Sequence, residues 1–143
     1  MAPASLEDLP RWARDLIDGC RVGHLGLLDD DDRPRVLPVT FAVCAGCLVS
    51  AVDHKPKRVA GSELARVRWL RDRPAAALTI DRYDDDWSRL AWVQAIGETA
   101  VIDEAQGALG ALRAKYEQYR ERPPAGPFIF LRPERFAHWR ASA

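Results

Sequence analysis

The chain has few of the residues that would settle its class at once. Its 143 residues include three cysteines and three histidines, and 21 basic side chains balance 21 acidic ones, so the formal net charge is zero. Three cysteines, an odd number, argue against a disulfide framework. A zero net charge argues against a general nucleic-acid binder, which is usually basic overall. We therefore expect no nucleic-acid partner.

Long apolar runs are also absent from the sequence. No stretch approaches the ~20 apolar residues that a membrane-spanning helix needs. The N-terminus lacks the basic region and apolar run of a signal peptide. We therefore expect a cytoplasmic protein with no membrane partner. The 48% hydrophobic and 29% charged fractions are typical of a soluble globular protein, and the length predicts one domain over residues 1–143.

Positive charge is concentrated in one segment, residues 51–73. This segment has three acidic side chains and seven basic ones, which are Lys55, Lys57, Arg58, Arg66, Arg68, Arg71 and Arg73. Gathering cations on one loop and helix costs self-repulsion unless an anion binds there, although a solvated helix face is the alternative reading. The segment directly follows an apolar strand-like stretch, and a basic loop between a strand and a helix N-terminus suits a phosphate. An anionic ligand is the first hypothesis.

Apolar periodicity and turn residues predict the secondary structure. Helices are expected over residues 5–18, 62–73 and 103–122. Strands are expected over 20–28, 35–44, 47–52, 75–80, 90–102 and 128–131, with a further short strand over 135–139. The two runs 35–44 and 47–52 should form a hairpin around Ala45 and Gly46. Pro38 favours an edge position for its strand, and Gly97 favours a β-bulge.

The order of these elements predicts a mainly β, α+β fold. About six antiparallel strands joined by short turns indicate a closed or split β-barrel with flanking helices. The four consecutive aspartates at 29–32 lack the alternating ligands, glycine and distal glutamate of a calcium loop, so we expect a solvated turn.

Catalytic side chains are not evident in the sequence. Nothing marks any of the three histidines as the base of a serine or cysteine nucleophile. Cys44 and Cys47 form a C-x-x-C pair, but the pair straddles a hairpin turn and has no second pair of ligands, which argues against a zinc or redox site. We therefore expect neither a resident metal nor a catalytic triad.

Four runs of the sequence carry a resemblance to a known family. The runs 35–41, 51–58 and 66–74 occur in the order seen in the pyridoxamine-5′-phosphate-oxidase-like split β-barrel superfamily. The run 83–93, followed by the strand with Gly97, resembles one branch of that superfamily, the proposed coenzyme F420 (deazaflavin)-dependent oxidoreductases. The resemblance covers roughly residues 10–140. It implies a homodimer with two cofactor sites at the subunit interface.

The resemblance also implies which residues hold the cofactor. Cations of the basic segment would bind its phosphate (Lys55, Lys57, Arg58 and Arg66), with Arg68 nearer a polyglutamate tail. Residues of two strand ends would line the ring and the ribityl chain (Val36, Pro38, Val39, Thr40, Ser50, Ala51, Val52 and Asp53). One position departs from the pattern, because relatives often have asparagine where this chain has Trp69.

The expected function follows from a cofactor that carries the reactive chemistry, so that no catalytic side chain is required. The resemblance implies an oxidoreductase that transfers a hydride between F420 and a small conjugated organic acceptor. One alternative is an FMN-dependent oxidoreductase or flavin reductase of the same fold, because both cofactors present a flat tricycle and a phosphate. Another is a non-enzymatic cofactor carrier or haem-binding protein.

Overall fold

The computed structural model describes residues 2–52 and 64–142. Its centre is a single antiparallel sheet with strand order β2-β1-β5-β6-β7-β4-β3. The strands are β1 (Gly23–Leu28), β2 (Pro34–Val39), β3 (Ala42–Cys44), β4 (Cys47–Ala51), β5 (Ala75–Arg82), β6 (Ala91–Ile102) and β7 (Phe128–Arg140). The helices are α1 (Arg11–Gly19), α2 (Ala65–Asp72), α3 (Gln106–Lys115) and α4 (Glu117–Glu121), with short 3-10 turns η1 (Leu6–Asp8) and η3 (Trp87–Arg89).

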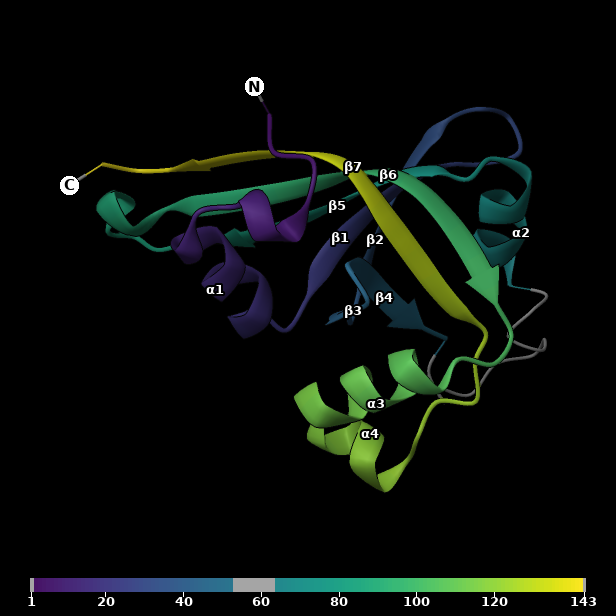
Figure 1. Ribbon diagram of the computed structural model, residues 1–143. Helices are drawn as coiled ribbons and strands as arrows, with labels where there is room; N and C mark the ends of the chain where they lie inside the picture. The colour runs from purple at the N-terminus through teal and green to yellow at the C-terminus, as the bar shows by residue number, and fades with distance from the viewer. Residues whose placement is uncertain (1, 53–63, 143) are drawn as a thin grey trace.

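The expected six-stranded barrel is corrected to an open sheet of seven strands. The run 35–44, expected as one strand, divides at Thr40 and Phe41 into β2 and β3, which lie at opposite ends of the strand order. The linker between Val39 and Ala42 can span only about 10 Å. The two edges of the sheet must therefore approach each other, and the sheet curls strongly, as Figure 1 shows for β6 and β7. Pro38 lies on edge strand β2, as predicted.

Two local predictions about the sheet are confirmed. β3 and β4 form a hairpin whose turn residues Ala45 and Gly46 have φ values of 52° and 79°. A two-residue hairpin turn with both φ values positive matches the twist of its strands. The β6–β7 ladder has a bulge at Ile96 and Gly97. A Cβ on Gly97 would lie 2.0 Å from the carbonyl oxygen of Arg132, so the bulge requires glycine.

Other boundaries differ from the prediction. The last strand is continuous over Phe128–Arg140, because β6 offers a partner along its whole length. The first α-helix begins at Arg11 rather than residue 5, since Pro10 stands at its N-cap after the turn η1. The helix expected over 103–122 divides into α3 and α4 at Tyr116, whose backbone is extended (φ −115°, ψ 120°).

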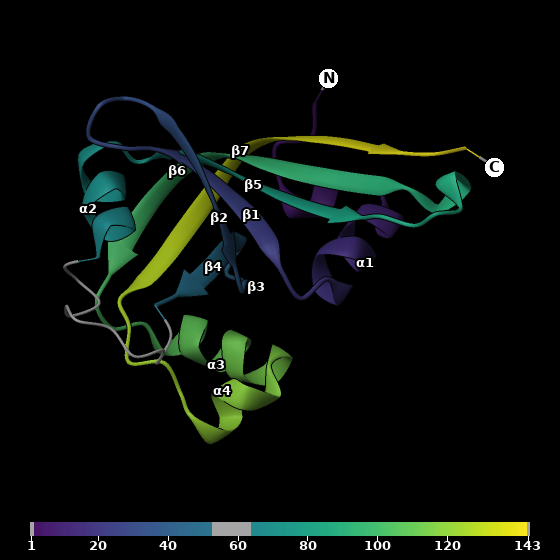
Figure 2. The same cartoon turned by 180° about the vertical axis from the view of Figure 1, so that it is seen from behind.

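The core has two parts. The larger part fills the inner side of the sheet, where Ile17 of α1 and Leu70 of α2 pack against residues such as Leu78 and Val93. The smaller part lies between the hairpin β3–β4 and the helices α3 and α4, with Val49 and Leu112 fully buried. Figures 1 and 2 show α1 beneath the long arm of β5, β6 and β7, and α3 with α4 beside β3 and β4. In the described ranges, no helix is long and apolar enough to cross a membrane.

Candidate functional site

The basic segment is only partly within the described residues. Asp53, Lys55, Lys57 and Arg58, all predicted to bind the cofactor, lie outside them. The described part begins at Leu64, which precedes α2. Arg66 in the first turn of α2 is partly buried and Arg68 is exposed. The first N–H groups of any helix point outward without intrahelical partners, so Arg66, predicted to bind the phosphate, stands at the end of α2 where an anion is favoured. Arg68, predicted to lie nearer the polyglutamate tail, follows two residues further along α2.

Two other cations of the segment are used inside the chain. Arg71 Nη2 lies 3.5 Å from Asp103 Oδ1. Arg73 donates to the Asp32 carboxylate and, from Nη2, to the Asp30 carbonyl at 3.3 Å. The aspartate turn 29–32, predicted to be merely solvated, therefore anchors the C-terminal end of α2. Arg71 and Arg73 are correspondingly not part of the candidate site.

Trp69 also fixes α2 to the sheet. Its ring is partly buried against the main core, and the Arg35 guanidinium carbon lies 4.8 Å from the ring centroid. Arg35 Nη1 is in turn 3.6 Å from Asp29 Oδ2. N–H donation from the Arg33 backbone, together with the nearby Arg35 charge, holds the pKa of Asp29 below its usual value. The residue that departs from the family pattern thus joins α2, β2 and the aspartate turn.

The predicted ring-lining residues of β2 divide between the two faces of the sheet. Val36 and Pro38 point outward, and Val36 is 67% exposed. Val39 points inward and is buried. Only Val36 and Pro38 can therefore offer side chains to a ring lying on the outer face.

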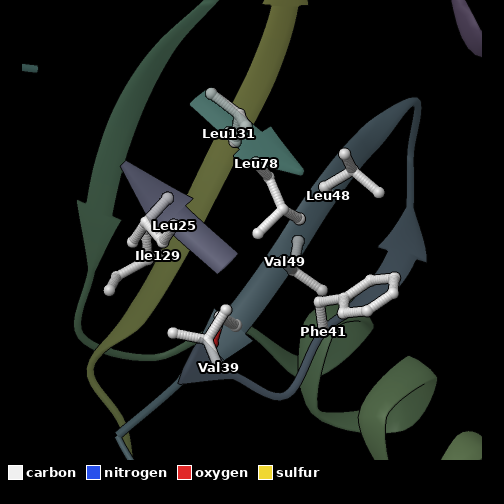
Figure 3. A pocket seen from close by; sticks show the side chains of 9 residues that line it. Leu25, Val39, Phe41, Leu48, Val49, Leu78, Ile129 and Leu131 are labelled. Atoms are coloured by element: carbon white, nitrogen blue, oxygen red, sulfur yellow. The ribbon is translucent and has the colours of Figure 1, made fainter. Parts of the chain in front are cut away.

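Ser50, Ala51 and Val52 are all buried. Ser50 lines a small hollow inside the sheet together with Val39, Phe41 and other apolar side chains (Figure 3). The hollow has room for about one water molecule. It is a packing gap within the core and is far too small for a tricyclic ring. Ala51 packs in the smaller core beside α3.

Thr40 lies where the chain passes from one edge of the sheet to the other. Its Oγ1 is 2.7 Å from the Tyr119 hydroxyl oxygen of α4. The next residue, Phe41, donates its backbone N–H to the Tyr116 hydroxyl at 3.0 Å. The sequence predicted only a helix over 103–122 and assigned no role to these two tyrosines. Their polar hydroxyls were the available signal, because a buried tyrosine hydroxyl usually has a partner.

Lys115 lies beside this crossover at the end of α3. Its Nζ donates to the Ile17 carbonyl at 3.3 Å and lies 3.7 Å from the centroid of the Phe41 ring. Burial, assisted by the nearby Arg21 charge, lowers the pKa of Lys115 to about 8. The lysine therefore ties α3 to the end of α1 at an electrostatic cost.

The outer face of β1, β2, β5 and β6 is a second feature beside the candidate site. Trp92 and Trp139 are paired across β6 and β7 and are 37% and 47% exposed. On the same face His24 and Asp81 approach to 4.0 Å, between Nδ1 and Oδ1. This face begins at Val36 and Pro38, so it is continuous with the exposed part of the predicted ring site.

The cysteine pair lies apart from these residues. Cys44 and Cys47 are direct partners in the β3–β4 ladder, and both are free thiols. Burial raises the pKa of the Cys47 thiol, which disfavours a reactive thiolate. In residues 2–52 and 64–142, no three side chains of the metal-ligating types come together.

Comparisons with known proteins establish the fold. No protein-family model matches the sequence, and no curated protein matches it. A proposed pyridoxamine 5′-phosphate oxidase from Listeria innocua is similar, with a TM-score of 0.62 and 18% identity over 87% of this chain and 92% of that one. An F420 reductase has a TM-score of 0.61 and 20% identity over 90% and 98% of the two chains. A heme binding protein from Mycobacterium smegmatis has a TM-score of 0.70 and 19% identity over 93% and 55%.

Identities this low bear on the fold alone. The three similar structures carry names that refer to different ligands, and one fold often supports several functions. The chain therefore has the mainly antiparallel β fold of pyridoxamine-phosphate-oxidase-like proteins with flanking helices, and the choice of ligand depends on its own residues.

Proposed function

We propose that this protein is an oxidoreductase that uses coenzyme F420 to transfer a hydride to a small conjugated organic acceptor. The similar structures support a fold used by cofactor-binding oxidoreductases. The observation that carries the proposal is the run of cations after β4, which continues into the first turn of α2. Cationic side chains form strong, charge-assisted hydrogen bonds with anionic groups, so this run of cations favours an anionic cofactor over a neutral ligand.

The residues fit such a cofactor by their chemistry. Lys55, Lys57, Arg58 and Arg66 would hold the phosphate, and Arg68 would lie nearer the acidic tail. Val36 and Pro38 would give the flat ring an apolar wall, with Thr40 at its edge. When bound, the deazaflavin supplies the hydride chemistry. The side chains of this protein then need only to bind it, orient it and exclude water.

The number of cations favours F420 over FMN. Arg71 and Arg73 are engaged by Asp103 and Asp32. Without them the segment still has Lys55, Lys57, Arg58 and Arg66, and four cations exceed the needs of one phosphate. A tail with several carboxylates would use the surplus. FMN on the same fold remains the alternative, and it would be recognised by a yellow, strongly fluorescent protein on purification.

We also propose that the working form is a homodimer. Val36 is largely exposed, so the described residues of one chain give a ring on the outer face of β2 a single wall. A second copy, related by a two-fold axis, would supply the other wall and cover Trp92 and Trp139. The ring site is incomplete without that copy.

The test of the proposal compares cations with different surroundings. Replacing Lys57 or Arg66 with alanine should weaken F420 binding by about 1.5–3 kcal/mol, the size of a charge-assisted hydrogen bond. Arg71→Ala is the matched control, because Arg71 is already paired with Asp103. The affinity of this variant for F420 should stay near that of the unmodified protein. Fluorescence titration of F420 measures all three. Wild-type affinity in both Lys57→Ala and Arg66→Ala would place the phosphate elsewhere.

The reaction itself is followed by the change in absorbance and fluorescence as reduced F420 is oxidised. Quinones, tetrapyrroles and enones form the panel of acceptors. We expect oxidation of the reduced cofactor that depends on protein and acceptor together. Binding without turnover of any acceptor would favour a carrier, and a Soret band after addition of haem would favour a haem-binding protein.

A further inference from the structure

The crossover between β2 and β3 consists of two residues, Thr40 and Phe41. It joins the two edges of the curled sheet, and Phe41 is fully buried. A linker this short transmits any movement of β3 or of its helices directly to the end of β2. What holds these two residues therefore sets the geometry at the end of the predicted ring site.

Two tyrosines hold both linker residues, one at the break between α3 and α4 and one on α4. Tyr119 is buried, and its hydroxyl oxygen lies 2.7 Å from Thr40 Oγ1. Tyr116 accepts the Phe41 N–H at 3.0 Å and lies 2.7 Å from the Arg21 carbonyl oxygen and 3.0 Å from the Phe41 carbonyl oxygen. A phenol has one hydrogen to donate, so its shorter contact, to Arg21, is the preferred acceptor. The two rings meet edge to face at 5.5 Å between centroids.

The tyrosines are themselves supported on the far side. Lys115 Nζ donates to the Ile17 carbonyl in the last turn of α1. Arg21 donates from Nη1 to the Lys115 carbonyl at the end of α3. Lys115 thus satisfies a carbonyl at the end of α1, and Arg21 satisfies one at the end of α3. Carbonyl groups in the last turn of a helix otherwise lack intrahelical partners. The unit of α3 and α4 is fixed to α1, so the phenol groups have a rigid base.

We infer that Tyr119 is a positioning residue for the cofactor site and acts through the Thr40 hydroxyl. The inference rests on the proposed function, in which Thr40 lies at the edge of the ring. A threonine hydroxyl can rotate among three staggered positions. The hydrogen bond to a buried phenol selects one position before ligand arrives, and the Thr40 hydroxyl keeps further hydrogen-bonding capacity for the ring. Because the Thr40 hydroxyl is already ordered in the folded protein, ligand binding carries no further entropy cost for ordering it.

The test is a double-mutant cycle on binding, with F420 as the probe. Tyr119→Phe should weaken F420 binding about fivefold and Thr40→Val about tenfold, as expected for one hydrogen bond. The double variant should bind no worse than Thr40→Val alone, since Tyr119 acts through Thr40. Thr40→Ser keeps the hydroxyl and should restore affinity. The absorption maximum of bound F420 should shift in Thr40→Val and Tyr119→Phe, and a merely structural effect on the fold would not move it.

The outcomes separate this inference from the proposed function. If F420 binds and Lys57→Ala weakens it, while Tyr119→Phe leaves both affinity and spectrum unchanged, the positioning role is wrong and the proposed function stands. Effects of Tyr119→Phe and Thr40→Val that multiply to about fiftyfold would also overturn it, because Tyr119 would then act independently of Thr40. A protein that binds neither F420 nor FMN would overturn both. Circular dichroism of each variant checks that it is folded.

Discussion

The inner and outer faces of the sheet use the same strands in opposite ways. On β6, Val93 is fully buried on the inner face while its neighbour Trp92 is 37% exposed on the outer face. On β2, Val39 is buried inside and Val36 is 67% exposed outside. Helices α1 and α2 pack on the inner side. On the outer side the side chains of Val36, Trp92 and Trp139 remain exposed.

This difference in burial between the two faces suggests that different side chains determine the stability of the fold and the binding of a ligand. Burial of apolar side chains on the inner face supplies most of the driving force for folding. We propose that the outer face binds the ligand and a second subunit, because a side chain that is not needed for folding is available for binding. Substitutions on the two faces should therefore have different readouts.

The largest effect is expected from the inner side. Phe41→Ala should lower the free energy of unfolding by about 3–5 kcal/mol, since the fully buried ring leaves a cavity. Val36→Ala, a nearby substitution on the outer face, should change it by less than about 0.5 kcal/mol. Urea unfolding of the two variants measures both. Equal losses would mean that the outer face contributes to the stability of the single chain.

The next effect concerns the outer face and the second subunit. Trp139→Arg should weaken dimerisation by about 2 kcal/mol or more, as for an interface aromatic residue, and should leave the folded monomer intact. The unmodified protein should have a mass of about 32 kDa at micromolar concentration, twice the 16.0 kDa of the chain. Light scattering of both proteins is the measurement. A monomeric unmodified protein that still binds F420 would refute the shared site.

A third prediction compares two glycines in different surroundings. Gly97→Ala should cost about 1–3 kcal/mol or more, because the new Cβ would meet the Arg132 carbonyl. Gly110→Ala in α3 should instead stabilise the fold by about 0.5–1 kcal/mol, because alanine is the better helix former. Among the described residues outside its own helical turn, no atom lies within 4 Å of the Gly110 Cβ position. Thermal unfolding should move the two variants in opposite directions. Similar shifts of one sign would contradict the bulge geometry.

The smallest effect is a pH dependence from Lys115. Its pKa of about 8 in the folded protein lies below the ordinary value of 10.5. Between these two values the unfolded chain binds more protons at this site, so the contribution of Lys115 makes the free energy of unfolding rise with pH across that window. Lys115→Met should remove this rise. Urea unfolding of both proteins below and above pH 8 gives the difference, and identical pH profiles would show that burial does not perturb the lysine.

Local sequence signals predicted the parts of the fold that depend on neighbouring residues. The hairpin turn at Ala45 and Gly46 depends on the local backbone of two residues. The bulge at Gly97 depends on one residue whose missing Cβ allows the close approach of the Arg132 carbonyl. The division of residues 35–44 at Thr40 depends on which distant strands pair with each half, and no local pattern contains that information. The break at Tyr116 likewise depends on contacts with Phe41 and Arg21, far away in the sequence.

The sequence likewise predicted only those features of the candidate site that depend on neighbouring residues. The concentration of cations over residues 51–73 is visible in the sequence. That Arg71 and Arg73 pair with Asp103 and Asp32 is not, because it depends on how α2 lies against the sheet. The Thr40–Tyr119 contact joins residues 79 positions apart, which only the curled sheet brings together.

We propose above all that the basic segment binds a polyanionic deazaflavin. The most direct measurement is a titration of the unmodified protein with polyglutamylated F420 and, in parallel, with FMN, each at low and at high salt. We expect saturable binding that is tighter for F420 than for FMN and that weakens strongly with salt, as screening of several ion pairs requires. Equal affinity for the two cofactors with no change between the salt concentrations, or no saturable binding of F420, would contradict it.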